Sequence, residues 1–319
     1  MAVNLAGSGQ QLDGSLPTVY EGFKLLYDAT GVMRSTATMM KLKPHSGTGV
    51  NVNNYGRLVA YTIGDGVDIT QAQDLSDATT TFTPGEVAVQ AIVAGSTQRR
   101  IADPDVFGKV GRMAAAAYDL KEDQDGASQL VNFTNALGSA GTVFSPGHAL
   151  AAQTRALYGN NRSNPEPFPG PWYLTHHPAA LLAIAGRCIP LSNVPTGTNV
   201  YGANTGAHAG ITTTNGGPSS MGESILREGI GALGHFAGAT VKATPNLIPD
   251  SSDDASGAYY SKEGLIYVNE VEARMDADSS DKSMRGAIEF NFWGSYTWGI
   301  YRSGASGVEL LFDCSNPTS

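Results

Sequence analysis

Charged side chains are scarce in this sequence. Asp, Glu, Lys and Arg make up only 15% of the 319 residues, whereas soluble domains average about 25%. Hydrophobic residues still reach 41%, which is enough for a core and too many for a disordered chain. Ser, Thr, Asn, Gly and Ala therefore take positions that charged side chains usually fill on a surface. We infer that much of this surface faces other protein.

Cysteine and long apolar runs are also few. Cys188 and Cys314 have no CxxC or metal-ligand spacing, which predicts two reduced thiols rather than a disulfide framework. The longest apolar run, Ala179 to Ala185, is far shorter than the roughly 20 residues that span a bilayer. Met1 to Gln10 lacks the cationic start and apolar stretch of a signal peptide. We therefore expect no membrane partner and a protein that stays, or assembles, in a cytoplasm.

Basic charge is short as well, since 20 Lys and Arg stand against 29 Asp and Glu, for a net charge of −9. A protein that reads nucleic-acid sequence is usually basic, so that function is disfavoured. The acids gather between Asp250 and Glu289, where ten acids and four bases give −6 of the −9. Two interpretations stay open: an ordinary solvated face, or a wall facing a polyanion that must not adhere to it.

Motifs that carry catalysis are missing. The sequence contains no GxSxG, no P-loop and no HExxH, and its six histidines are scattered. Gly229 to Gly234 matches GxGxxG, but a predicted helix precedes it and a strand follows, which reverses the order that a dinucleotide site needs. Asp276 to Asp281 lacks the central Gly and final Glu of a calcium loop and predicts a solvated acidic loop. We expect no catalytic, cofactor or metal site.

The first 36 residues predict an arm without a core of its own. Within it, Leu16 and Pro17 open a short helical pattern. Its apolar side chains fall on one face: Val19, Phe23, Leu26 and Tyr27.

The hydrophobic period changes to two after the arm. Thr38, Met40 and Leu42 predict a strand that ends at Pro44, and a turn-rich segment, residues 45–54, follows. The dipeptide Asp65-Gly66 lies between Arg57 to Ile63 and Val67 to Thr70, which predicts a β-hairpin because the turn needs positive φ. A return strand is expected, with one face formed by Val87, Val89, Ala91 and Val93.

A long helix is predicted next. Asp103 is a suitable cap and Pro104 suits the first helical position. A helix from 104 to 137 would be about 50 Å long, with Gly138 as its stop. The expected apolar stripe consists of Val106, Val110, Met113, Ala117 and Leu120.

Short helices and strands follow, and the C-terminal strands return to period two. Helices are expected from Pro146 to Gly159 and from Pro178 to Gly186. Strands are expected at residues 172–175, 240–243, 264–269, 286–293, 296–301 and 308–312. The order of strands, long helix, mixed block and strands predicts an α+β fold.

This order resembles the major capsid proteins of tailed bacteriophages, which have the HK-97-like fold. The resemblance rests on Met39 to Gln98 as extended loop and return strand, Asp103 to Leu137 as spine helix, and Met284 to Asp313 as closing strands. The step from Tyr173 to Pro178 and the glycine turn from Glu228 to Val241 resemble the same family. It implies an N-terminal arm (1–36), an extended loop (37–82), a peripheral domain (83–137 and 282–319) and an axial domain (138–281).

The resemblance also implies a function. The chain would be a structural protein, not an enzyme, that forms hexamers and pentamers of an icosahedral virion shell. Expected partners are scaffolding, portal and cement proteins, and packaged DNA without sequence-specific binding. The hairpin would contact a neighbouring subunit through Val59, Tyr61, Ile63, Gly64, Asp65 and Gly66. The alternatives are a tail-tube or other virion protein, or a soluble α+β hydrolase or binding protein.

Overall fold

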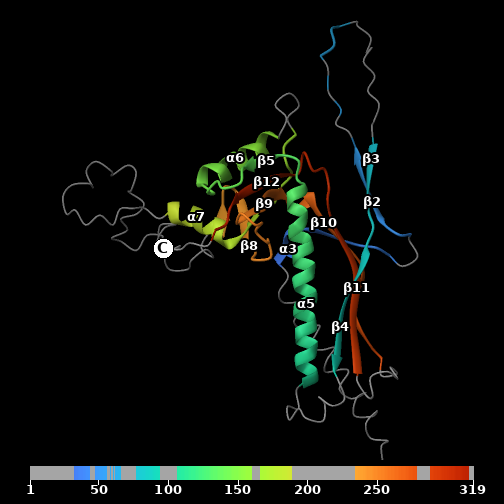
Figure 1. The fold of residues 1–319 in the computed structure, drawn as a ribbon. Coiled ribbons are helices and arrows are strands. Elements are labelled where there is room, and N and C mark those ends of the chain that lie inside the picture. Colours follow the sequence, from blue (N-terminus) through green and yellow to red (C-terminus); the bar gives the residue numbers. More distant parts are fainter. Residues whose placement is uncertain are drawn as a thin grey trace, which may run out of the picture. The chain divides into compact units, whose positions relative to one another are not determined.

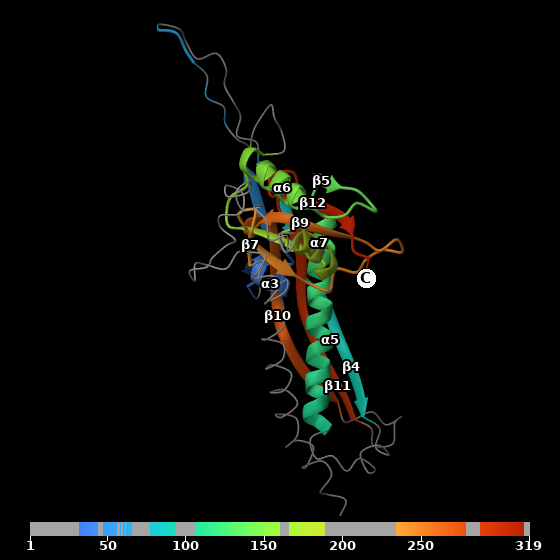
Figure 2. The same ribbon diagram turned by 90° about the vertical axis from the view of Figure 1, so that its left-hand side faces the viewer.

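The computed structural model describes residues 32–43, 47–55, 58, 60, 62–65, 77–93, 106–159, 166–188, 234–278 and 288–315. They form helices and strands arranged in three sheets, as the predicted α+β class requires (Figures 1 and 2). The described residues divide into two compact units. The first unit takes them from 39–119 and 266–302, and the second from 31–38, 120–265 and 303–319. None of the described helices has the length and hydropathy of a membrane span.

These units draw their boundaries differently from the predicted domains. The peripheral domain was expected to include residues 303–319 and the whole long helix, whereas contacts group residues 303–319 and the helix from Leu120 onward with the second unit. Residues 266–281, expected in the axial domain, belong to the first unit. The four-part division concerns roles in a shell and stays a prediction.

The first unit contains a four-stranded sheet in the order β1-β10-β11-β4. β11 and β4 pair antiparallel from Ile288 opposite Val93 to Tyr296 opposite Gly85. Half-buried Val87, Val89 and Ala91 alternate with exposed neighbours, so the predicted face of β4 is confirmed for these three residues. The two strands expected in the C-terminal region form one continuous strand, β11. The bounds are β1 Thr38–Lys41, β4 Gly85–Val93, β10 Leu265–Asp278 and β11 Ile288–Ile300.

The helix α5 (Val106–Ser128) lies along β11 and β4 in both views (Figures 1 and 2). The ring of Tyr118 meets the ring of Tyr296 edge-on, with centroids 5.9 Å apart. A Cβ added to Gly294 of β11 would collide with the Tyr118 hydroxyl. Small residues line the same buried side of the helix at Gly111, Ala114 and Ala115. The helix therefore packs close to the sheet because the residues at the contact have small side chains or none.

The long-helix prediction is wrong in its C-terminal part and in its buried face. The helix ends at Ser128, a 3-10 turn η1 follows (Gln129–Asn132), and Leu137 lies in strand β5 (Ala136–Gly138) because it pairs with β12. The C-terminal part of the expected stripe faces outward: Met113 is 72% exposed and Leu120 is 45% exposed. The buried face of α5 instead consists of small residues, which let the helix pack close to the sheet. The expected start at Asp103 and Pro104 lies outside the described residues.

The first expected hairpin strand, Arg57 to Ile63, does not form at the residues of it that are described, and Val67 to Thr70 lie outside the described residues. Pairing runs between β2 (Val50–Tyr55) and β3 (Asp77–Phe82), and the first of these was expected to be turn-rich. Leu58, Ala60 and residues 62–64 form no strand. Val50 and Val52 pack beside a small core of Leu42, Phe82, Ile266 and Val268. The outward face is held by side-chain hydrogen bonds, in which Thr81 donates to Asn51 over 2.7 Å and Thr79 donates to Asn53 over 3.0 Å.

The second unit is built on a six-stranded sheet in the order β5-β12-β9-β6-β8-β7. β9 pairs antiparallel with β12 and β6, and β6 pairs parallel with β8. The expected helices are confirmed as α6 and α7, with Gly159 ending the first at φ 78°. The bounds are α6 Pro146–Tyr158, β6 Trp172–His176, α7 Pro178–Cys188, β7 His235–Phe236, β8 Ala239–Ala243, β9 Asp254–Ser261 and β12 Gly307–Asp313.

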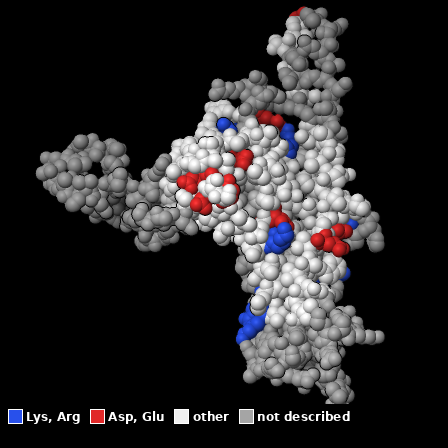
Figure 3. Space-filling model, in the orientation of Figure 1, with Lys and Arg blue, Asp and Glu red and all other residues white. Residues whose placement is uncertain are grey.

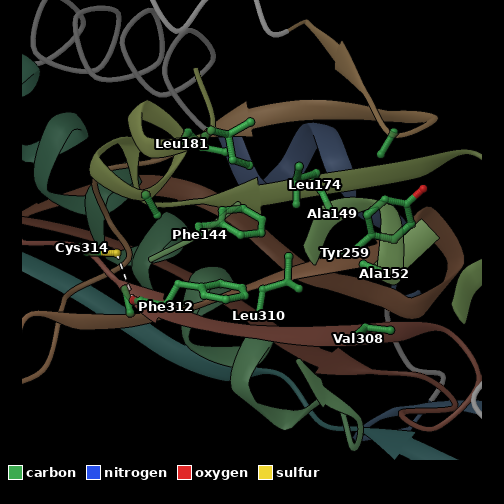
Figure 4. Close-up of a cluster of buried hydrophobic side chains, with 14 of the residues drawn as sticks. Phe144, Ala149, Ala152, Leu174, Leu181, Tyr259, Val308, Leu310, Phe312 and Cys314 are labelled. Atoms are coloured by element: carbon green, nitrogen blue, oxygen red, sulfur yellow. Dashed lines mark hydrogen bonds between the residues drawn. The ribbon is translucent and has the colours of Figure 1, made fainter. Parts of the chain in front are cut away.

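Successive residues of β9 point to opposite faces of this sheet. Tyr259 points into a core that α6 and α7 cover (Figure 4). Tyr260 points the other way, where it stacks on Phe133 with ring centroids 5.7 Å apart. The core on the first side consists mainly of Phe144, Ala149, Ala152, Leu174, Leu181, Val308, Leu310 and Phe312.

We predict that Gly294→Val destabilises the chain by about 1–3 kcal/mol, because overpacking forces α5 away from β11. The matched control is Gly304→Val, since a Cβ at Gly304 meets nothing within 4 Å. Chemical denaturation of both variants measures the difference. Equal stabilities would contradict the close packing at Gly294.

Candidate functional site

A buried pair, Cys314 and His176, has the residue types of a nucleophilic site. The Sγ of Cys314 lies 4.0 Å from Nδ1 of His176. Burial lowers the pKa of His176 to about 4 and raises the pKa of Cys314 to about 11. Both groups are therefore neutral near pH 7, whereas a nucleophilic cysteine must be a thiolate.

The hydrogen bonds of His176 explain its place in the core. Its Nδ1 accepts from the backbone N–H of His177 over 2.8 Å, which leaves Nε2 to donate to the carbonyl of Leu310 over 3.1 Å. The ring of Phe144 lies 5.3 Å from the imidazole. The pair has a structural role. Among the residues that the structure describes, no group of three or more His, Cys, Asp or Glu could hold a metal ion.

Stability should fall on mild acidification because of His176. The folded state holds its pKa near 4, below the usual 6.5, so the unfolded state binds the proton first as the pH falls. The stabilisation is complete above pH 6.5 and is lost between about 6.5 and 4, by about 3 kcal/mol.

Urea denaturation at pH 7 and pH 4.5 tests this expectation. The wild type should lose more stability between the two pH values than His176→Gln does. Burial also lowers the pKa of the neighbouring His177. Because His177 is present in both proteins, the difference between them reports on His176 alone. If the wild type and His176→Gln lost the same stability between pH 7 and pH 4.5, the role assigned to His176 would be wrong.

A second polar site holds the end of the N-terminal arm. The carboxylate of Asp123 in α5 is 4% exposed and accepts the N–H of Met33 in the short helix α3 (Val32–Thr36) over 2.7 Å. It also accepts from Thr244 over 3.0 Å and from the Asn246 amide over 2.7 Å.

Further contacts fix α3 on the same unit. Arg34 forms an ion pair with Glu122 over 3.2 Å, and Tyr260 donates its hydroxyl to Thr36 over 2.6 Å. Met33 and Thr36 are fully buried. The last residues of the arm, Val32 to Thr36, are therefore anchored beside α5.

Removing the Asp123 carboxylate should cost about 3 kcal/mol, since three buried or partly buried donors lose a charged acceptor. Asp123→Ala should lose this stability, whereas Asp125→Ala, whose carboxylate pairs with Lys121 at the surface, should change it by about 0.5 kcal/mol or less. Denaturation curves of the two variants give the comparison. A similar loss in both would show that Asp123 is not the anchor.

Several surfaces are apolar and exposed. On α6, Leu150, Leu157 and Tyr158 are 52%, 49% and 69% exposed, and on α5 the row of Met113, Ala117 and Leu120 faces outward. Most of the described surface in Figure 3 is uncharged. The low charge content therefore coincides with open apolar helix faces, which sequence periodicity had assigned to the core on α5.

The predicted contact residues of the extended loop are described only in part. Ile63 is 45% exposed, Gly64 is exposed, and Asp65 is exposed in a turn. Val59, Tyr61 and Gly66 lie outside the described residues. The structure supplies the base of this loop, β2 and β3, which sequence reasoning missed because Val and Asn alternate in the former and Thr dominates the latter.

The acidic stretch is not a single loop. Asp276 and Asp278, expected in a loop, belong to β10, while Asp281 lies outside the described residues. Asp254 is buried and accepts the N–H of Gly141 over 2.7 Å. Among the acids whose exposure the structure describes, the exposed ones are Asp250, Asp253, Glu263, Glu270 and Glu272.

Comparison with known proteins identifies the fold. No protein-family profile matches the sequence, and no curated protein matches it. Solved structures do match along nearly the whole chain. The acid-stable capsid of Helicobacter pylori bacteriophage KHP30 aligns with a TM-score of 0.64 and 10% identity, covering 89% of this chain and 92% of that one.

Two more structures agree. A chain from Mycobacterium phage Che8 aligns with a TM-score of 0.57 and 16% identity, covering 90% of this chain and 93% of that one. The capsid of cyanophage P-SCSP1u aligns with a TM-score of 0.59 and 13% identity, covering 90% of this chain and 89% of that one. The chain thus has the fold of phage capsid proteins, and the predicted HK-97-like class is confirmed.

Proposed function

We propose that this chain is the major capsid subunit that assembles into an icosahedral shell around phage double-stranded DNA. The observation that carries the proposal is coverage in both directions, since the KHP30 capsid match spans 89% of this chain and 92% of that one. A fold shared along nearly the whole chain supports a structural role. The chain acts as a structural protein and has no active site.

The surface chemistry supports the same function. A shell subunit touches several neighbours, so its surface needs fewer charged side chains than that of an isolated globule. Weak individual contacts suffice, because a closed symmetric shell adds many of them. The exposed apolar side chains of α5 and α6 fit such contacts.

The extended loop forms one of these contacts. It rises from β2 and β3 and lies across a neighbouring subunit through Val59, Tyr61, Ile63 and the turn Gly64 to Gly66. Ile63 is 45% exposed in the single chain, so a neighbour has apolar area to bury there. A two-stranded ribbon is marginally stable alone, which favours support from a second copy.

The remaining assignments follow from this function. Residues 1–36 serve as arm, 37–82 as extended loop, 83–137 with 282–319 as peripheral domain, and 138–281 as axial domain. Subunits form hexamers and pentamers in the bacterial cytoplasm with scaffolding, portal and cement proteins. DNA is enclosed without sequence-specific binding, and the acidic stretch supports a lining that does not adhere to it.

Expression of the chain with phage head proteins tests the proposal. Closed particles, pentamers or hexamers are expected by light scattering and electron microscopy. Ile63→Asp should stop assembly while the subunit stays folded, because it buries an unpaired charge at a contact. Thr62→Asp is the matched control at the adjacent position and should still assemble.

Two results would contradict the proposal. A stable monomer under every condition would remove the shell function. Open tubes of uniform width would favour a tail-tube protein. Normal assembly of Ile63→Asp would overturn only the contact assigned to the extended loop.

A further inference from the structure

One row of side chains on α5 is covered along half its length and open along the other half. Residues three or four apart share a face of a helix, which places Ala116, Leu120, Asp123 and Ala127 in one row. Asp123 and Ala127 are 4% and 2% exposed. Ala116 is exposed and Leu120 is 45% exposed. The cover on this row therefore stops between Leu120 and Asp123.

The root of the N-terminal arm contacts Asp123 together with Thr244 and Asn246. The N–H of Met33 donates to the Asp123 carboxylate over 2.7 Å, and Arg34 pairs with the neighbouring Glu122. The arm thus joins the described chain at the point where the open half of the row begins.

The open half of the row combines apolar side chains with the exposed Lys109 and Arg112, which lie on the same face of α5. Met113 is 72% exposed, and Ala116, Ala117 and Leu120 extend the same surface. A flexible methionine adapts to a partner of irregular shape. The largest apolar side chains of this part of α5 face outward while Gly111, Ala114 and Ala115 face the sheet.

The arm contains a segment with the complementary pattern. Leu16 to Tyr27 places Val19, Phe23, Leu26 and Tyr27 on one helical face and Lys24 on the other. A helix of about 12 residues is marginal alone in water and needs an apolar surface to cover that face.

The arm is long enough to reach the row in its own copy. Along α5, Leu120 lies about 4.5 Å and Met113 about 15 Å from Asp123, at 1.5 Å per residue. The six residues from Tyr27 to Met33 span up to about 20 Å. We propose that residues 16–27 form an amphipathic helix that lies on Met113, Ala116, Ala117 and Leu120 of the same copy.

Oxidation of Met113 by dilute peroxide in the unassembled full-length chain tests the proposal. The arm should shield Met113, so the double variant Phe23→Asp, Leu26→Asp should oxidise it at least ten-fold faster than the wild type. Lys24→Asp places the same side chain on the polar face and should leave the rate unchanged. Met39, which is 55% exposed, serves as the internal reference.

Hydrogen exchange gives a second readout. Leu120→Asp should remove the amide protection of residues 16–27, whereas Leu157→Asp, on the similarly exposed face of α6, should not. If these amides exchange as in a free peptide in the wild type, or Met113 oxidises as fast as Met39 there, the proposal is wrong.

A disulfide identifies the copy that supplies the arm. Phe23→Cys with Leu120→Cys, in a Cys188→Ser background, should crosslink within one chain and run as a monomer on a non-reducing gel. A crosslinked dimer would overturn the same-copy assignment. These tests use unassembled subunits, so their outcome is independent of whether the chain forms a shell.

Discussion

The close approach of α5 to β11 depends on residues that have almost no side chain. Gly294 leaves room for the Tyr118 hydroxyl, and Ala114 and Ala115 bring the helix backbone down to the sheet. Tyr118 then contacts Tyr296, which lies 5.9 Å from Tyr267 in the next strand. This choice of inner face also decides what the helix shows outside, because Met113 and Leu120 are left exposed. The surface proposed to bind the arm is thus a consequence of how the interior packs.

The elements that could be predicted from sequence are those with strong local signals. Pro146 and Gly159 bound α6 as expected, and the aromatic alternation from Phe290 to Trp298 marks β11. The errors arose where tertiary packing overrides local preference. Small residues on α5 have low hydrophobicity, so periodicity selected the face with Met113. In β2, the Asn residues lower the average hydrophobicity, although Val50 and Val52 face the core.

The candidate sites were likewise predictable only where a local sequence signal marks them. Asp-Gly correctly marked a turn at Asp65, but it could not locate the paired strands, of which the first ends at Tyr55 and the second begins at Asp77. The anchor at Asp123 had no sequence signal, since its donors come from residues 33, 244 and 246. Contacts across such sequence distances appear only when the chain is folded.

The buried thiol of Cys314 has a consequence for chemical durability. A subunit of the proposed shell would leave the reducing interior of a host cell and then meet oxygen and peroxides. Oxidation and disulfide exchange both begin with a thiolate, and burial raises the pKa of Cys314 to about 11. At neutral pH only about one molecule in ten thousand would carry that thiolate. The sulfur of Cys314 therefore contributes to the core as an apolar atom, and this thiol reacts slowly with oxidants and disulfides at neutral pH.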